Sequence, residues 1–186
     1  GPSGRIPRPN CKWYVCEEAK KPGSKSARLQ TSTFLEFPPK AGQLRAGNSN
    51  VLIDISQDFE KQIKRIGNKA INHVFLTHGH ADAAFGLPFL ANKKYQEKFN
   101  PVIHIEKQTF KILRKEMPVI NNLNFSAADG QFIKPYKKYD FRDFHVIPFR
   151  VEHSFNPLFL TLGYLFKTGR QRIPYASDFK KIPAKS

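Results

Sequence analysis

Two histidines and an aspartate at alternate positions form the stretch with the clearest chemistry. His78, His80 and Asp82 directly follow an apolar run at residues 71–77, whose composition is typical of a buried strand. A strand that ends at Thr77 would place both imidazoles close together in the loop beyond it. Imidazole nitrogens held by a rigid element suit a divalent metal ion, and the carboxylate can bind a second ion or orient a metal-bound water. The spacing therefore predicts a metal site.

Four motifs, in their order along the chain, resemble the signature of the metallo-β-lactamase superfamily. Residues 77–87 read Thr-His-x-His-x-Asp-x-x-x-Gly-Leu, and residues 51–54 are similar to the strand that ends in a structural aspartate. Residues 151–154 are similar to the segment with the third histidine, and residues 175–178 to the strand end with a metal-bridging aspartate. The resemblance implies an α+β fold, a four-layer αβ/βα sandwich, formed as a single domain by residues 1–186.

The same resemblance implies the metal ligands. His78, His80 and His153 would hold a first Zn²⁺ ion and leave a fourth position open for water. Asp178 would fill that position or bridge to a second ion. Asp82 would bind the second ion or act as the catalytic residue that holds the attacking water. The implied activity is hydrolysis of a phosphodiester bond by a metal-bound hydroxide, with Mn²⁺ as the alternative ion.

Three departures from the family's pattern affect these expectations. Ala83 stands where the family has a histidine for the second metal. The chain also ends eight residues after Asp178, before the family's final histidine, and begins where the family has completed its first strand. We therefore expect one well-occupied metal site, a weak second site, doubtful activity, and a sandwich without its first strand and C-terminal end. Open sheet edges invite pairing with a second copy, which predicts a homodimer.

Flanking motifs leave the substrate open. Residues 4–9, with Cys11 and Cys16, are similar to the opening of the cyclic phosphodiesterase branch, whose best-known member opens a phosphoribosyl cyclic phosphate. Residues 163–164 and 177–183 are similar to that branch and to the tRNA 3′-processing endonucleases. A small cyclic phosphate or nucleotide is the first expectation. The alternatives are an RNA-processing endonuclease of the tRNA 3′-end type and a catalytically disabled nucleic-acid-binding module with the same fold.

Charge is the most unusual feature of the composition. The 31 Lys and Arg residues outnumber the 15 Asp and Glu residues, which leaves a net charge of +16. A positive field concentrates phosphate-bearing ligands, nucleic acid above all, although a basic host proteome would produce the same composition. The sequence has no apolar run long enough to span a membrane, no signal-peptide pattern and only two cysteines, so a cytoplasmic protein is expected.

Hydrophobic periodicity and turn residues predict the elements that position the site. Residues 1–16 are expected to form a loop, and residues 17–27 an exposed, mobile basic segment. Strands are expected at 29–37, 51–55, 71–77, 101–105, 123–125, 131–133, 141–151, 159–166 and 172–176. Helices are expected at 57–66 and 108–117, with helical pieces at 84–99. His73, His104 and His145 are interpreted as structural.

Overall fold

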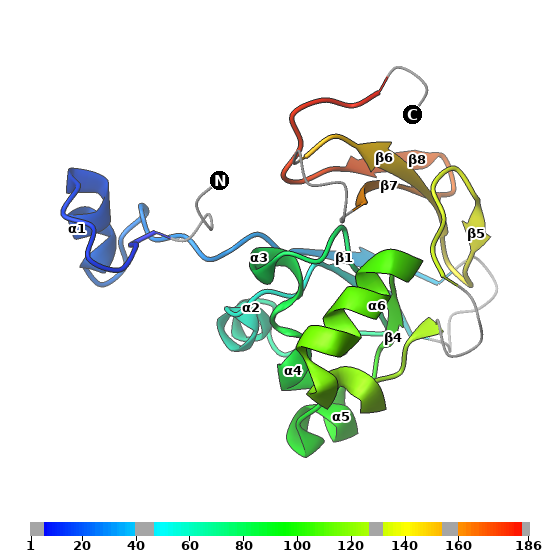
Figure 1. The fold of residues 1–186 in the computed structure, drawn as a ribbon, viewed down its shortest axis with the longest axis horizontal. Helices are drawn as coiled ribbons and strands as arrows, with labels where there is room; N and C mark the ends of the chain where they lie inside the picture. The colour runs from blue at the N-terminus through cyan, green and yellow to red at the C-terminus, as the bar shows by residue number, and fades with distance from the viewer. Residues whose placement is uncertain (1–5, 40–46, 127–131, 154–159, 184–186) are drawn as a thin grey trace.

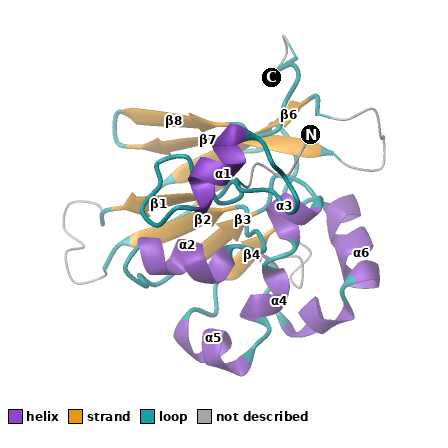
Figure 2. Cartoon of the chain, turned by 90° about the vertical axis from the view of Figure 1, so that its left-hand side faces the viewer, coloured by secondary structure: helices purple, strands orange, loops and turns teal. Residues whose placement is uncertain are grey.

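Two four-stranded sheets face each other across a hydrophobic core (Figures 1 and 2). The computed structural model describes residues 6–39, 47–126, 132–153 and 160–183. The first sheet has the order β1 (Thr33–Phe37), β2 (Ser49–Ile53), β3 (His73–Phe75), β4 (Val102–His104). The second has the order β5 (Tyr139–Asp140), β6 (His145–Val151), β7 (Thr161–Thr168), β8 (Gln171–Tyr175). The second sheet is antiparallel, whereas β2, β3 and β4 run parallel.

Side chains alternate between the two faces of β2, so this one strand contributes to two cores. Val51 and Ile53 belong to the core between the sheets, together with Tyr164 of β7. Leu52, on the opposite face of the pleat, belongs to the core beneath the helices. Every residue of β2 is buried, as expected for a parallel strand that is covered on both faces.

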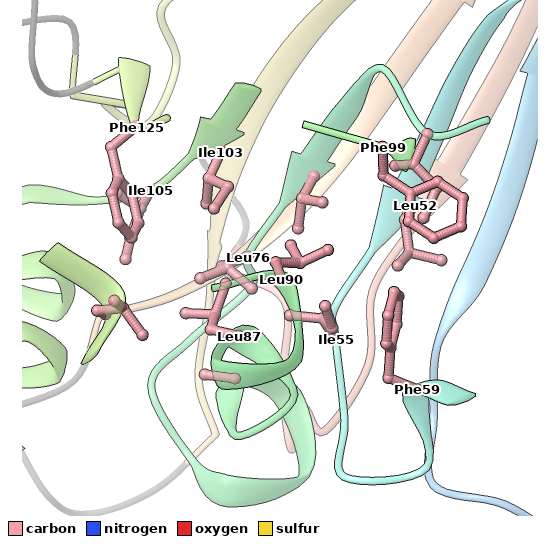
Figure 3. Close-up of a cluster of buried hydrophobic side chains, with 14 of the residues drawn as sticks. Leu52, Ile55, Phe59, Leu76, Leu87, Leu90, Phe99, Ile103, Ile105 and Phe125 are labelled. Atoms are coloured by element: carbon pink, nitrogen blue, oxygen red, sulfur yellow. The ribbon is translucent and has the colours of Figure 1, made fainter. Parts of the chain in front are cut away.

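The helices from α2 to α6 gather on the outer side of the first sheet (Figure 1). Their bounds are α2 (Phe59–Arg65), α3 (Ala81–Ala84), α4 (Leu87–Leu90), α5 (Lys93–Lys98) and α6 (Lys107–Glu116). Phe59, Leu87 and Leu90 pack beneath them against Leu52 and Ile103 of the sheet (Figure 3). Within the described part of the chain, no helix is long and apolar enough to cross a membrane.

The predicted α+β class with two sheets is confirmed. The helical layer on the outer face of the first sheet is present, while none of the described helices lies over the outer face of the second (Figure 1). The predicted order of strand, helix and strand from residue 51 to residue 77 corresponds to β2, α2 and β3. This unit ends immediately before the predicted metal loop.

Two expectations about local structure are wrong. The N-terminal loop and mobile segment contain a helix, α1 (Tyr14–Lys20), in which the buried Cys16 and Ala19 share one side. Ion pairs three residues apart, from Lys20 to Glu17 and from Lys21 to Glu18, add to its stability. The expected strand at 123–125 is reduced to one bridge between Phe125 and Ile103, and residues 132–133 form no strand. Residue 131 lies outside the described ranges.

His73 and His104 pack against aromatic side chains of the core between the sheets, as expected for structural residues. His73 Nδ1 lies 3.1 Å from His104 Nε2, and the His104 ring stacks on Phe75 with a centroid distance of 4.4 Å. Burial lowers the pKa of His73 to about 4, with a contribution from Arg142. Burial likewise lowers the pKa of His104 to about 3, with a contribution from His73. Both imidazoles are therefore neutral in the folded protein at neutral pH.

From the lowered pKa values of His73 and His104 we predict that the protein loses stability in mild acid. Between about pH 6.5 and 4 the unfolded chain binds protons at these histidines and the folded chain does not. The free energy of unfolding should therefore fall as the pH is lowered through this window, by up to about 1.4 kcal/mol per pH unit for each histidine. Urea unfolding of chelator-treated protein between pH 7.5 and 5 measures the slope. His104→Phe, which keeps a ring on Phe75, should show a shallower slope, and an equal slope would contradict this assignment.

Candidate metal centre

The predicted site residues lie in the segments that follow three strands. His78 and His80 follow β3, and Asp82 lies in the first turn of α3. His153 follows β6 in the second sheet, and Asp178 follows β8. Ligand atoms of His78 lie within 4.8 Å of those of all four other residues. Residues a hundred positions apart are thus brought together because the two sheets pack face to face.

Three imidazoles form the more enclosed part of the site. His78 is buried, and His80 and His153 are half-buried. Their ring centroids lie 4.7 to 5.2 Å apart, and the ring planes are steeply inclined to one another. His153 Nε2 lies 3.2 Å from His80 Nδ1. Two nitrogens bound tetrahedrally at the usual Zn–N distance would lie roughly 3.3 Å apart, so this spacing matches a shared ion.

His78 Nε2 provides the observation that tests whether a metal ion fits. This nitrogen is buried and has no hydrogen-bond partner in the described part of the chain. Leaving a buried polar atom unpaired costs about 1–3 kcal/mol, a cost that a bound cation would remove. Burial, followed by the neighbouring His80 and His153, lowers the pKa of His78 to about 3. The imidazole is therefore neutral at physiological pH, which is the form that binds metal, and the residues fit a divalent ion.

The other nitrogen of His78 is held by a buried chain of polar groups. Nδ1 lies 2.8 Å from Thr77 Oγ1, which lies 2.9 Å from each carboxylate oxygen of Asp54. The Thr77 hydroxyl has one proton; when it donates that proton to Asp54, it accepts one from His78 Nδ1. Nε2 then carries the lone pair on the side of His80 and His153. Thr77 and Asp54 thereby orient the ligand and select its tautomer.

Asp54 is buried beneath the candidate ligands and has a left-handed backbone with φ of 60°. The Thr77 backbone N–H donates to its Oδ1 at 2.8 Å, and the Ser177 hydroxyl donates to its Oδ2 at 3.4 Å. Burial raises the pKa of Asp54 to about 7 despite these donors, and the nearby Asp178 charge adds to the increase. The residues before His78 and Asp178 are thus joined through one carboxyl group.

We expect Thr77→Val to weaken metal binding while leaving the fold intact. Valine keeps the volume and branching of threonine but removes the hydroxyl, so His78 Nδ1 loses its partner. Loss of such an outer partner typically costs about 10–100-fold in metal affinity. Competition titration of Zn²⁺ against a chromogenic chelator measures the change. Thr77→Ser, which retains the hydroxyl, is the matched control, and equal affinities for the valine and serine variants would contradict the proposed relay.

The two carboxylates form a second group with His78 rather than an independent site. His78, Asp82 and Asp178 have ligand atoms within 4.8 Å of one another, and Asp178 is exposed. His78 has only one nitrogen available, because Nδ1 is engaged by Thr77. The two groups therefore compete for the same Nε2. Ala83 is buried in α3 beside them and offers no donor.

Sequence reasoning missed several residues that position the ligands. Thr77 and Ser177 stand in the family motifs but were given no role, although both contact Asp54. Tyr164 stands in the motif at 163–164 and was likewise given no role, although its buried hydroxyl donates to the Leu76 carbonyl beside the metal loop. A hydroxyl residue directly before His78 and another before Asp178 were the available signals.

With this fold and centre, the chain has the architecture of a metallo-β-lactamase-type protein. Residues 49–186 match the family model of the beta-lactamase superfamily domain, so the chain belongs to that family. This confirms the predicted fold class, which carries the expectation of a divalent metal ion. No curated protein matches the sequence.

Solved structures support the same fold. A diphosphatase from the PhnP family is 22% identical, with a TM-score of 0.67, and the match covers 89% of this chain and 58% of that one. Zn²⁺-bound PqqB from Methylobacterium extorquens is 18% identical, with a TM-score of 0.68 and coverage of 92% and 60%. The short form of human tRNase Z is 18% identical, with a TM-score of 0.58 and coverage of 86% and 67%. The chain thus spans about three fifths of the first two structures.

Proposed function

We propose that the protein is a metal-dependent hydrolase that cleaves phosphodiester bonds, with Zn²⁺ as its preferred ion. The observation that supports this most directly is the unpartnered, buried Nε2 of His78, which lies beside the imidazoles of His80 and His153. Three imidazole nitrogens form a ligand set typical of a catalytic zinc site, in which one position stays open. Two carboxylates lie within reach of the same place.

The residues around the centre have distinct proposed roles. A divalent ion at this position supplies a Lewis acid that ionises water near neutral pH. Asp82, half-buried in the first turn of α3, holds the attacking water and accepts its proton. Asp178, which is exposed, completes the ligand set or holds a second, weakly bound ion. Asp54 and Thr77 keep His78 in the tautomer that leaves Nε2 free.

The proposed substrate is a small cyclic phosphate or nucleotide. The N-terminal motif similar to the cyclic phosphodiesterase branch supports this class, as does the likeness in fold to a diphosphatase. An RNA-processing endonuclease is the second candidate, favoured by the net charge of +16. A catalytically disabled binding module is the third, and it is favoured by alanine at position 83.

Metal content and turnover together test the proposal. Protein dialysed against Zn²⁺ or Mn²⁺ is analysed for metal per chain and assayed with bis(p-nitrophenyl) phosphate. We expect one ion per chain, turnover that a chelator abolishes, and little turnover in Asp82→Asn. Two tightly bound ions would contradict the single complete site. One ion without turnover would favour the disabled module, and turnover by metal-free protein would refute the proposed chemistry.

A further inference from the structure

Residues 6–28 form a projecting segment, here called the N-terminal arm. Backbone hydrogen bonds between Ile6 and Arg28, of 3.0 and 2.9 Å, close the arm where it joins the rest of the chain. Helix α1 lies at its far end, well away from both sheets (Figure 1). The family match begins at residue 49, so the arm lies outside the matched part of the chain. The proposed metal centre uses none of the residues of the arm.

The end of the arm exposes two neighbouring aromatic side chains. Trp13 and Tyr14 are 77% and 78% exposed, more than any other large hydrophobic residue in the described ranges. The other side of α1 is anchored, since Cys16 and Ala19 are buried. Tyr14 is the first residue of α1 and Trp13 is its N-cap, so both rings are exposed at the start of an ordered helix. Exposed tryptophan and tyrosine with a free ring face are typical of binding surfaces.

The arm is also strongly basic. Its only acidic residues, Glu17 and Glu18, are engaged by Lys20 at 2.6 Å and by Lys21 at 2.5 Å. Four further cationic residues form no ion pair within the described part of the chain: Arg8, Lys12, Lys25 and Arg28. The exposed rings thus belong to an arm that carries four cations outside these ion pairs. This combination suits a ligand that carries both flat rings and negative charge.

We propose that the N-terminal arm binds single-stranded nucleic acid, with bases stacked on Trp13 and Tyr14 and phosphates neutralised by the surrounding cations. Stacking platforms combined with positive charge are the usual means of binding single strands without sequence preference. A second copy of the chain is a poor partner for the arm because it repeats the charge of +16; the predicted homodimer would pair through sheet edges instead. A membrane surface is also disfavoured, since only Val15 extends the apolar area on a helix of seven residues.

The position of the arm connects this binding surface to the candidate metal centre. In Figure 1, α1 projects from the side of the molecule on which α2 and α3 lie, and α3 carries Asp82. A nucleic-acid strand bound by the arm would therefore lie on the same side of the molecule as the candidate metal centre. Only this connection, and not the binding itself, rests on the proposed phosphodiesterase function.

Trp13 allows the test to be made without a label, because it is the only tryptophan in the chain. Oligouridylate and oligothymidylate of about ten nucleotides are added to chelator-treated protein, so that binding is measured without hydrolysis. We expect both strands to quench the tryptophan fluorescence. Anisotropy with labelled strands should show about a tenfold or greater loss of affinity for the Trp13→Ala/Tyr14→Ala double variant. Val119→Ala/Tyr136→Ala, two exposed residues elsewhere, is the matched control and should bind normally.

The salt dependence gives a second, independent readout. Lys12→Ala and Lys25→Ala should each reduce the slope of log affinity against log salt by about one. Absence of quenching, or unchanged affinity in the double aromatic variant, would overturn the proposal. Quenching by phosphatidylserine vesicles but not by either oligonucleotide would replace it with membrane binding. Metal content and bis(p-nitrophenyl) phosphate turnover are measured separately, so failure here leaves the proposed hydrolase function to its own test.

Discussion

His78→Ala should remove metal binding and phosphodiester hydrolysis together. His78 belongs to both groups of candidate ligands, the three histidines and the pair of carboxylates. Without its Nε2, neither group retains three donors. Loss of an outer partner costs about 10–100-fold in metal affinity, and we expect loss of this shared ligand to exceed that range. Metal content after dialysis and turnover of bis(p-nitrophenyl) phosphate measure both effects.

Two other histidine variants make this prediction specific. His153→Ala leaves His78, Asp82 and Asp178 together, so it should retain weak metal binding. His145→Ala, which removes the partner of Asp140 in the second sheet, should retain full metal content. The expected metal affinity thus decreases from His145→Ala to His153→Ala and is lowest in His78→Ala. Equal residual affinity in the last two would show that the carboxylates do not bind the ion.

Gly86→Ala should destabilise the fold strongly, because an added methyl group would collide with the backbone of the β2–α2 turn. A methyl group at Gly86 would lie 2.2 Å from the Ser56 carbonyl oxygen and 2.8 Å from that of Ile55. The backbone cannot simply move away, because the Gly86 N–H donates to the Ile55 carbonyl at 2.8 Å. We expect a loss of about 3 kcal/mol or more in the free energy of unfolding.

Urea unfolding followed by far-ultraviolet circular dichroism measures this loss; tryptophan fluorescence would report mainly on the arm. Gly169→Ala is the control, since a methyl group there meets no atom within 4 Å and the residue has φ of +52°. Its cost should be about 1–2 kcal/mol, from the left-handed backbone alone. A smaller loss for Gly86→Ala than for Gly169→Ala would mean that the β2–α2 turn yields to the added methyl group.

Those parts of the protein that depend on local pattern could be predicted from the amino-acid sequence. The apolar run before His78, the helical periodicity of residues 57–66 and the alternation in the last strands reflect which face of each element is buried. That pattern depends on neighbouring residues only, so β2, α2, β3, β6 and β7 lie close to their expected places. The family resemblance likewise rests on short motifs, and the match over residues 49–186 confirms it.

How these motifs act on one another depends on the packing of elements that are distant in the sequence. That His153 Nε2 lies 3.2 Å from His80 Nδ1 depends on the packing of two sheets, which no local pattern encodes. The hydrogen-bonded link from Asp54 through Thr77 to His78 joins residues that follow separate strands. The same link determines which nitrogen of His78 is free. Helix α1 was not predicted, because local sequence pattern does not show the contacts that stabilise it. It is short, lies among glycine and proline residues, and is stabilised by contacts within the arm, whereas sequence propensity alone favours a loop there.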